Sequence, residues 1–385
     1  MLIAGDPSGD MLAAELVAAL RTEAQARGLA PRFFGAGGAH LAQAGVALAF
    51  DLTAHSVIGL SDALRKAFKF HRLMNQLVCL ALAHRPDVII CIDFSAFNRQ
   101  FALGVKSLLH DRFLSIRGWQ PKIVQYVSPQ VWASRPGRAK VMPRAYDLLL
   151  TIFPFEKPWY AERVPGFPVE FVGHPMLDRH SNVERGARNA ECGPLEVLLL
   201  PGSRASELRR HLPVMIPAVE RIARKAPGTR FRMVLPGDSL VALAREVAPV
   251  PDAVPIQVGG LAEALRSATI SIAATGTVTM ECALFGVPTV ALYKTSWSTY
   301  QFFRRIIQVK YLAMPNLLAG EMVFPEFIQD AATADNLAGA ALELLSSPAR
   351  RREVEARLAA IIANLGGPGA ARRAARAVLD LVAAR

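Results

Sequence analysis

Residues 86–98 read Pro-Asp-Val-Ile-Ile-Cys-Ile-Asp-Phe-Ser-Ala-Phe-Asn. The central run, 88–92, is short, apolar throughout and rich in β-branched side chains. This pattern is typical of a strand in a parallel sheet that is covered on both faces. A carboxylate, Asp93, follows the run directly. Because open α/β sheets bind ligands outside the carboxyl ends of their strands, the stretch predicts both a fold class and a functional position.

On either side of this run, each half of the chain shows a similar alternation of predicted strands and helices. In the first half, the pattern predicts a helix over 10–27 and strands at 2–4, 32–34, 88–92 and 123–127. In the second half, it predicts a helix ending near 225, another over 277–285, and strands at 196–200, 231–235, 269–273 and 289–293. Alternating elements joined by short Gly/Pro turns indicate an α/β protein with doubly wound sheets.

The length of 385 residues predicts two such domains, since one domain usually takes about 100–200 residues. We expect an N-terminal Rossmann-like domain over 1–170 and a C-terminal one over 171–340. A helical tail over 341–385 is expected to pack back on the first domain. Residues 164–178 are rich in Pro and Gly, so they are expected to form the interdomain linker, with His174 packing between the lobes.

Composition narrows the class of protein. Hydrophobic residues make up 52% of the chain, yet no apolar run approaches the roughly 20 residues of a membrane-spanning helix. Asp6 and Pro7 follow the apolar start too soon for a signal peptide, so a cytosolic or membrane-peripheral protein is expected. Four scattered cysteines without a Cys-x-x-Cys pair predict reduced thiols, with neither a metal site nor a disulfide.

The net charge of +12 points to an anionic partner: nucleic acid, an acidic membrane surface or a phosphorylated substrate. A genome that prefers Arg would explain the same excess. No nucleic-acid-binding motif accompanies the charge, which argues against nucleic acid. Residues 65–77 place Arg65, Lys69 and Arg72 on one helical stripe beside apolar side chains. The stripe suits an interfacial helix on anionic lipid, and equally a solvated basic face.

Small and polar residues follow the first strand of each half. Residues 5–10 read Gly-Asp-Pro-Ser-Gly-Asp, where backbone N–H groups at a helix start can approach a ligand. In the second half, Gly202 and Ser203 can donate to phosphate oxygens while Arg204 offers a guanidinium to a diphosphate. Each turn could also be an ordinary helix cap.

Two further positions complete the expected site. The turn 275–277 follows the next apolar strand and can donate to another phosphate oxygen, while Glu281, one helical turn later, suits a ribose diol. Burial beside apolar neighbours would raise the pKa of Asp93 towards that of a useful base. Glu281 as a surface charge and Asp93 as a helix cap are the alternatives. No Asp-x-Asp, His-Glu-x-x-His or Gly-x-Ser-x-Gly motif occurs, which predicts a metal-independent site without a hydrolase triad.

Read in order, these segments resemble the lipid-A-disaccharide synthase family along nearly the whole chain. The matching motifs are AGDPSGD (4–10), GAGG (35–38), VIGLSDAL (57–64), PDVIICIDFSAFN (86–98), YVSPQVWASRPGR (126–138), FPFE (153–156), FVGHPMLD (171–178), LLPGSR (199–204), TGTVTMECAL (275–284) and MPNLLAG (314–320). Other two-Rossmann (GT-B) transferases and UDP-sugar epimerases would share the nucleotide half, but not YVSPQVWA or IDFSAFN.

The resemblance implies an inverting GT-B glycosyltransferase that needs no cofactor. It would join UDP-2,3-diacylglucosamine to 2,3-diacylglucosamine 1-phosphate, giving the β-1,6-linked lipid A disaccharide and UDP. It further implies a location peripheral to the cytoplasmic face of the inner membrane, and it allows for a homodimer. The implied catalytic residue is Asp93. The implied substrate-binding residues are Ser8, Gly9, Asp10, Asn98, Ser128 and Trp132. The implied UDP-binding residues are Gly202, Ser203, Arg204, Thr275, Gly276, Thr277, Glu281 and Asn316.

The chain departs from the family pattern at two positions. Asp6 stands where the family usually has Glu, and Ala96 stands where it usually has a second Asp. The second departure leaves Asp93 as the only base candidate in that segment. The expected first strand is also shorter than the usual ~5–6 residues, which predicts a start codon upstream of Met1.

Overall fold

The computed structural model describes residues 1–55, 63–110, 118–180 and 194–384. The described chain forms two compact units, one made of 1–181 with 365–385 and the other of 182–364. The first unit therefore extends eleven residues beyond the expected boundary at 170/171. Cys192, the start of the 57–64 motif, and the side chains of Arg65 and Lys69 lie outside the described residues, so the basic stripe over 65–77 is not described as a surface.

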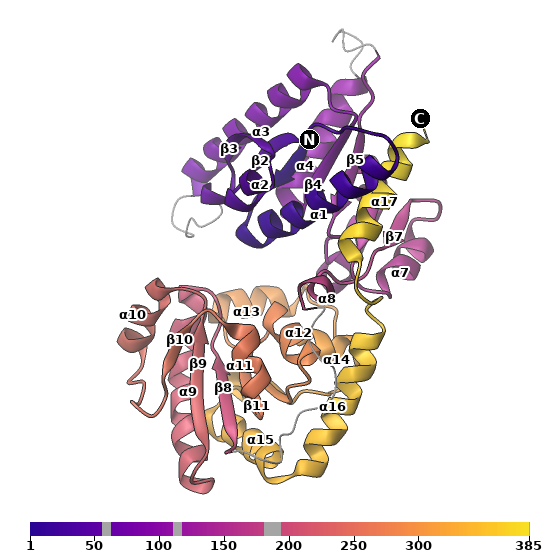
Figure 1. Ribbon diagram of the computed structural model, residues 1–385. Coiled ribbons are helices and arrows are strands. Elements are labelled where there is room, and N and C mark those ends of the chain that lie inside the picture. Colours follow the sequence, from indigo (N-terminus) through magenta and orange to yellow (C-terminus); the bar gives the residue numbers. More distant parts are fainter. Residues whose placement is uncertain (56–62, 111–117, 181–193, 385) are drawn as a thin grey trace. The chain divides into compact units, whose positions relative to one another are not determined.

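A seven-stranded parallel sheet forms the centre of the first unit, in the order β3-β2-β1-β4-β5-β6-β7 (Figure 1). Its strands are β1 (Leu2–Ala4), β2 (Phe34–Gly37), β3 (Ala47–Asp51), β4 (Val88–Ile92), β5 (Lys122–Tyr126), β6 (Leu148–Thr151) and β7 (Val169–Phe171). The helices are α1 (Pro7–Ala26), α2 (Ala39–Gln43), α3 (Ala63–His84), α4 (Ser95–His110), α5 (Val131–Ser134), α6 (Met142–Ala145), α7 (Glu156–Arg163), α8 (Met176–Arg179) and α17 (Ala370–Ala383). Short 3-10 turns lie at Thr53–His55 and Pro136–Val141.

Side chains of alternate residues divide the core of this unit between the two faces of the sheet. Ile89 and Cys91 pack on one face with residues of α3 and α4, while Ile90 and Ile92 pack on the other with residues of α1 and α17. This period of two on a sheet covered on both sides explains why 88–92 is apolar at every position.

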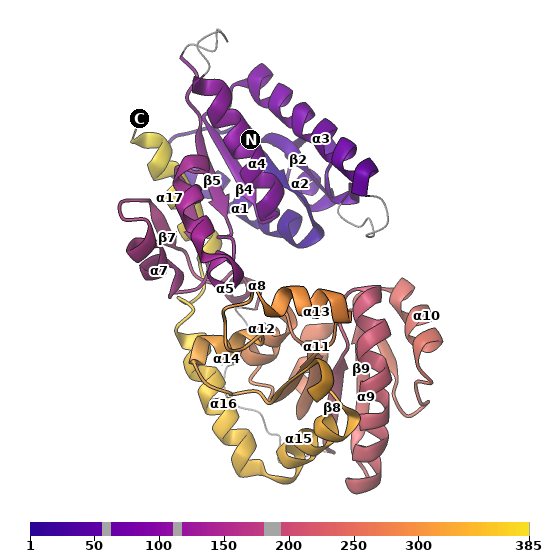
Figure 2. The same cartoon turned by 180° about the vertical axis from the view of Figure 1, so that it is seen from behind.

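The last helix returns to the first unit. α17 packs against α1 (Figures 1 and 2), and Ala374, Ala375 and Val378 join the core there. Its N-terminus is capped by Asp178, whose carboxylate accepts from the N–H groups of Gly369, Ala370 and Ala371. The two helices that directly precede it in the chain, within 334–363, belong to the second unit.

The linker expected at 164–178 is wrong, because this stretch lies within the first unit. It contains β7, which pairs with β6 along the sheet, and α8. The Pro and Gly residues there mark the turns on either side of a short edge strand. His174 is half-buried in the same unit with its ring 5.5 Å from that of Phe153, and desolvation lowers its pKa to about 4.

The second unit has a six-stranded parallel sheet in the order β10-β9-β8-β11-β12-β13, of which Figure 1 labels β10, β9, β8 and β11. Its strands are β8 (Glu196–Leu200), β9 (Arg230–Leu235), β10 (Ile256–Val258), β11 (Ile270–Ala274), β12 (Thr289–Tyr293) and β13 (Glu326–Ile328). The helices are α9 (Ala205–Lys225), α10 (Asp238–Val247), α11 (Leu261–Ser267), α12 (Thr277–Leu284), α13 (Trp297–Arg304), α14 (Met314–Ala319), α15 (Ala334–Ser346) and α16 (Pro348–Ala363). A 3-10 turn lies at Gln329–Ala331.

Both sheets reverse their strand order beside their first strand, between β1 and β4 in one unit and between β8 and β11 in the other. At such a switch point the loops of neighbouring strands leave to opposite faces and open a crevice at the carboxyl edge. The segments that leave the sheet there are 5–10 (which includes the start of α1) and 93–94 in the first unit, and 201–204 and 275–277 (which includes the start of α12) in the second. The predicted fold class, two doubly wound α/β domains, is confirmed. These segments, which are expected to bind substrate, lie at the two switch points.

Candidate active site

The loop after β1 is held by Asp6. This residue is the N-cap of α1, and its Oδ1 accepts from the Gly9 N–H at 2.6 Å and from the Ser8 hydroxyl at 2.9 Å. Gly5 is required by close packing, since a Cβ there would lie 2.2 Å from the ring of Phe94. The loop and the residues after β4 therefore fit together closely.

Asp93 lies in this fitted region, largely buried at the carboxyl end of β4. Its backbone has a φ of 44°, in the left-handed region that an L-residue rarely adopts. Burial, and to a smaller extent the negative charge of Asp6, raise its pKa to about 6, against the opposing effect of a hydrogen bond from the Phe94 N–H. A carboxylate with that pKa is charged at neutral pH and can still accept a proton from a substrate.

Two buried amides hold the backbone of Asp93. The Nδ2 of Asn98 and the Nε2 of Gln125 each donate to the Asp93 carbonyl at 2.9 Å. The Asp93 N–H donates to the Tyr126 carbonyl at 2.7 Å. Asn98 was expected to bind substrate. Its fully buried side chain positions the candidate base, as does Gln125, which the sequence analysis missed.

The three residues expected near the acceptor occupy different surroundings. Ser8 is exposed in the first turn of α1, and a Cβ on Gly9 would lie 3.6 Å from that of Asp93. Asp10 is 2% exposed, and its two oxygens accept from the N–H groups of Gly38 and His40 at 2.6 and 2.8 Å. Its carboxylate joins the first turn of α1 to the segment that follows β2.

Ser128 and Trp132 belong to a buried network around Glu156. The indole N–H of Trp132 donates to Oε1 of Glu156 at 3.1 Å, and the N–H groups of Ile152 and Phe153 donate to Oε2. Ser128 donates to the Tyr160 hydroxyl at 3.3 Å. Burial raises the pKa of Glu156 to about 7. Glu156 lies in the FPFE motif between Phe155 and Lys157, and this local sequence gave no sign of its burial.

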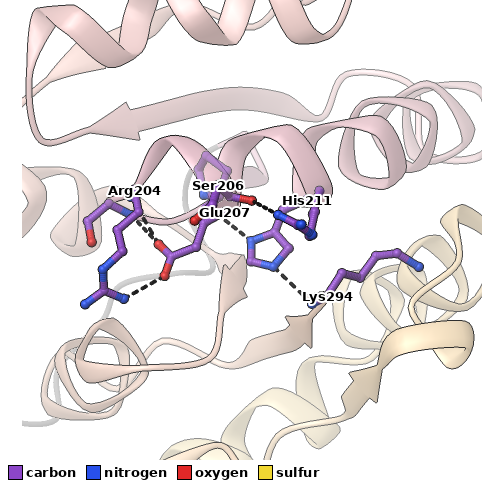
Figure 3. Close-up of polar contacts among 8 residues, drawn as sticks. Arg204, Ser206, Glu207, His211 and Lys294 are labelled. Carbon is purple, nitrogen blue, oxygen red and sulfur yellow. Dashed lines mark hydrogen bonds and ion pairs between the residues drawn. The ribbon is translucent and has the colours of Figure 1, made fainter. Parts of the chain in front are cut away.

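In the second unit, a carboxylate from the same chain occupies the expected phosphate turn (Figure 3). Oε2 of Glu207 accepts from the N–H groups of Ser203 and Arg204 at 2.8 and 3.2 Å, and its Oε1 accepts from the Arg204 guanidinium at 2.9 Å. Gly202, at a φ of 125°, has no room for a side chain, because a Cβ would lie 2.4 Å from Oε2 of Glu207. These donors form an anion site, and Glu207 fills it.

A buried histidine joins this turn to the neighbouring strands (Figure 3). Nδ1 of His211 lies 2.6 Å from the Pro201 carbonyl, and Nε2 accepts from the Lys294 N–H at 3.1 Å. A carbonyl can only accept, so the proton of the neutral ring is on Nδ1. Burial lowers the pKa of His211, which favours this neutral form. Lys294 in turn donates from Nζ to the Gln329 carbonyl at 2.7 Å.

The turn 275–277 leaves β11, the strand beside β8. Gly276 and Thr277 are exposed and Thr275 is half-buried at the start of α12. Glu281 lies half-buried one turn along that helix. The strand order places this turn next to 201–204 on one edge of the sheet, as expected for two parts of one anion site.

Asn316 was expected on the UDP side, and it is fully buried. Its Oδ1 accepts from the N–H groups of Val323 and Phe324, while its Nδ2 donates to the Phe324 carbonyl at 2.8 Å and to Glu326 at 3.1 Å. These contacts use the amide to hold the loop between α14 and β13. No group of His, Cys, Asp or Glu side chains suited to a metal ion occurs within the described ranges.

Comparisons with known proteins agree with this arrangement. A family model described as Lipid-A-disaccharide synthetase matches residues 1–380. The lipid-A-disaccharide synthase of Alkalilimnicola ehrlichii is 36% identical over 388 residues, covering 98% of this chain and 97% of that protein. Two solved structures share the fold, each covering 98% of both chains. They are a UDP-GlcNAc 2-epimerase from Neisseria meningitidis (TM-score 0.63, 12% identical) and the glycotransferase of kitacinnamycin (TM-score 0.58, 18% identical). The chain belongs to the lipid-A-disaccharide synthetase family of glycosyltransferases.

Proposed function

We propose that this enzyme transfers 2,3-diacylglucosamine from UDP to 2,3-diacylglucosamine 1-phosphate, forming the β-1,6-linked lipid A disaccharide and UDP. Family membership supports the disaccharide-forming reaction. The acylated substrates, the cytoplasmic face of the inner membrane as the place of action, and a homodimeric state are parts of the proposal. The described helices include none long and apolar enough to cross a membrane.

In the proposed step, the Asp93 carboxylate accepts the proton of the acceptor's 6-hydroxyl group. The freed oxygen forms a bond to the anomeric carbon on the face opposite UDP. The bond between that carbon and the β-phosphate oxygen breaks, and UDP leaves with the electron pair. One displacement of this kind inverts the anomeric configuration.

The second unit would hold the nucleotide. Arg204 and the N–H groups at the starts of α9 and α12 would meet the charge that develops on the diphosphate. Glu281 would bind the ribose hydroxyls. The chain has no Asp-x-Asp motif, so the proposal assigns the diphosphate to these donors without a metal ion.

The observation that carries the proposal is Asp93 itself. It is a largely buried carboxylate at a switch point, held by two buried amides, with its pKa raised to about 6. A sugar hydroxyl is a poor nucleophile at neutral pH, and a base positioned in this way removes its proton during attack.

Mass spectrometry of a reaction with the two acylated sugars tests the proposal. The expected products are the disaccharide and UDP in equal amounts, unchanged in rate by EDTA. An epimerised sugar nucleotide, or activity abolished by EDTA, would contradict it. UDP alone should also raise the melting temperature, because a ligand that binds only the folded state stabilises it.

A further inference from the structure

Helix α13 (Figure 1, orange) is unusually exposed for its sequence, Trp-Ser-Thr-Tyr-Gln-Phe-Phe-Arg. None of its eight residues is buried. Trp297 is 74% exposed, Phe302 55% and Phe303 45%. Large aromatic side chains lose favourable free energy when they face water, so several together on one short segment indicate a surface that is covered in use.

Positive charge accompanies these aromatic residues. No Asp or Glu occurs between Glu281 and Glu321, whereas this segment carries Lys294, Arg304, Arg305 and Lys310. Arg304 and Arg305 are exposed, and neither has an acidic partner among the residues that the structure describes. Lys294 is used within the fold, since its Nζ donates to two backbone carbonyls.

Helix α13 follows strand β12 at the carboxyl edge of the second sheet, which is the edge where the nucleotide is proposed to bind. It begins three residues after Lys294, whose N–H donates to the ring of His211. His211 also contacts the Pro201 carbonyl in the turn of the anion site. Ser296 caps the helix by accepting from the Thr299 N–H at 3.2 Å, so the chain enters α13 in a fixed direction.

We propose that α13 and the basic residues 304, 305 and 310 form an interfacial surface that docks on a bilayer with acidic headgroups. Aromatic side chains would enter the headgroup region, and the free arginines would lie against lipid phosphates. The inference rests on the proposed function, which requires an acylated donor to reach the nucleotide edge from a lipid surface. It assigns this contact to the second unit, apart from the stripe at 65–77.

Tryptophan fluorescence tests the contact directly. Trp297 is exposed, whereas Trp119 and Trp132 are buried and Trp159 is half-buried. Vesicles of phosphatidylcholine with 30% phosphatidylglycerol, carrying brominated acyl chains, are expected to quench the full-length protein. The quenching should disappear in Trp297→Ala. Equal quenching in that variant, or none in the wild type, would overturn the proposal.

Vesicle sedimentation tests the charges. The double variant Arg304→Gln/Arg305→Gln should bind the same vesicles about 30-fold more weakly, with little change on pure phosphatidylcholine. The matched control is Arg224→Gln/Arg245→Gln, two exposed arginines of the same unit, which should leave binding unchanged. Equal losses in both variants would reduce the effect to net charge and overturn the assignment.

Two other occupants give different results. If α13 binds a second copy of this chain, Phe302→Ser/Phe303→Ser would change the sedimenting mass without changing vesicle binding. If it binds nucleic acid, an oligonucleotide would displace the protein from vesicles. Either result overturns the bilayer proposal. Failure of the wild type to form the disaccharide while vesicle binding follows α13 would instead refute the proposed function alone.

Discussion

The two switch points of this molecule use the same backbone arrangement for opposite electrostatic purposes. In each unit a parallel strand, a small-residue turn and a helix start lie beside a second strand of the crevice. In each unit, a carboxylate of the protein accepts hydrogen bonds from backbone N–H groups at the helix start. This carboxylate is Asp6 for α1 and Glu207 for α9.

The difference lies in the charge that faces these caps. Asp6 lies near a second carboxylate, Asp93, and raises its pKa, which suits a group that must accept a proton. Glu207 lies against the guanidinium of Arg204, which is 76% exposed and available to an incoming anion. Each unit thus supplies a helix start at its switch point, and the charge of one neighbouring side chain distinguishes the proposed base in the first unit from the proposed anion site in the second.

Replacing Asp93 by Asn should have the largest effect. Loss of a general base commonly lowers the rate by ~10²–10⁴-fold, so kcat should fall by that order while UDP binding in the other unit stays near normal. Steady-state kinetics and UDP titration calorimetry measure both. Near-normal turnover by the folded variant would refute the role of Asp93.

The same variant separates catalysis from stability. A carboxyl whose pKa is raised on folding, here from 3.8 to about 6, destabilises the folded state increasingly as pH rises through that interval. Asn carries no charge, so at pH 8 the free energy of unfolding should rise, by up to about 3 kcal/mol. A loss of stability at pH 8 would indicate that the carboxylate makes structural contacts.

Removing the cation from the second switch point should have the next largest effect. Arg204→Ala is expected to lower kcat/KM for the UDP-sugar by about 10- to 100-fold, since a charge-assisted contact to the diphosphate is lost. The guanidinium is largely exposed without ligand, which keeps the expected loss moderate. Arg209→Ala, at an exposed ion pair on the same helix, is the matched control. Equal kinetics in the two variants would exclude Arg204 from the diphosphate site.

Neutralising Glu207, the carboxylate that competes with the diphosphate for the turn, should increase the affinity for UDP. Glu207→Gln keeps an oxygen that can accept from the Ser203 N–H, but it removes the charge that occupies the anion site. We expect UDP to bind about three- to tenfold more tightly, with a small decrease in melting temperature. Glu246→Gln, at an exposed pair with Arg209, controls for net charge. Weaker UDP binding in Glu207→Gln would mean that the cap is needed to shape the turn.

The smallest effect is expected from Asp6→Asn, which keeps a capping oxygen but removes a negative charge near Asp93. The base must be deprotonated to act, so wild-type activity should fall as pH drops below about 6. Without the charge of Asp6, this acidic limb should move to lower pH by less than about one unit. A pH–rate profile measures the shift. Movement to higher pH would contradict the electrostatic account.

The central strands of both sheets could be predicted from their sequences, and the edge strands could not. The runs 88–92 and 197–200 are apolar throughout because both faces of each strand are covered, and the predicted bounds of the two strands, 88–92 and 196–200, match β4 and β8. β3, β7, β10 and β13 are edge strands whose residues are not uniformly buried, and β7, β10 and β13 also lack a continuous apolar run. β6 was also missed, although all four of its residues are buried.

Candidate site positions were easier to predict than the contacts of their side chains. Asp93 and the turns at 202–204 and 275–277 do lie at switch points. Asn98 and Asn316, by contrast, use their amides on backbone groups inside the fold. A motif marks a residue that matters, but it does not distinguish one that touches a ligand from one that holds the loop around it.

The sequence by itself determined the alternation of strands and helices, the two glycine turns and the carboxylate after the apolar run, since these depend on local periodicity and residue type. Only the tertiary structure decided which groups meet. Asp6 and Asp93 are 87 positions apart, and their electrostatic effect on each other requires β1 and β4 to pair. The burial that raises the pKa of Asp93 likewise comes from distant segments, because desolvation depends on everything packed around a charge.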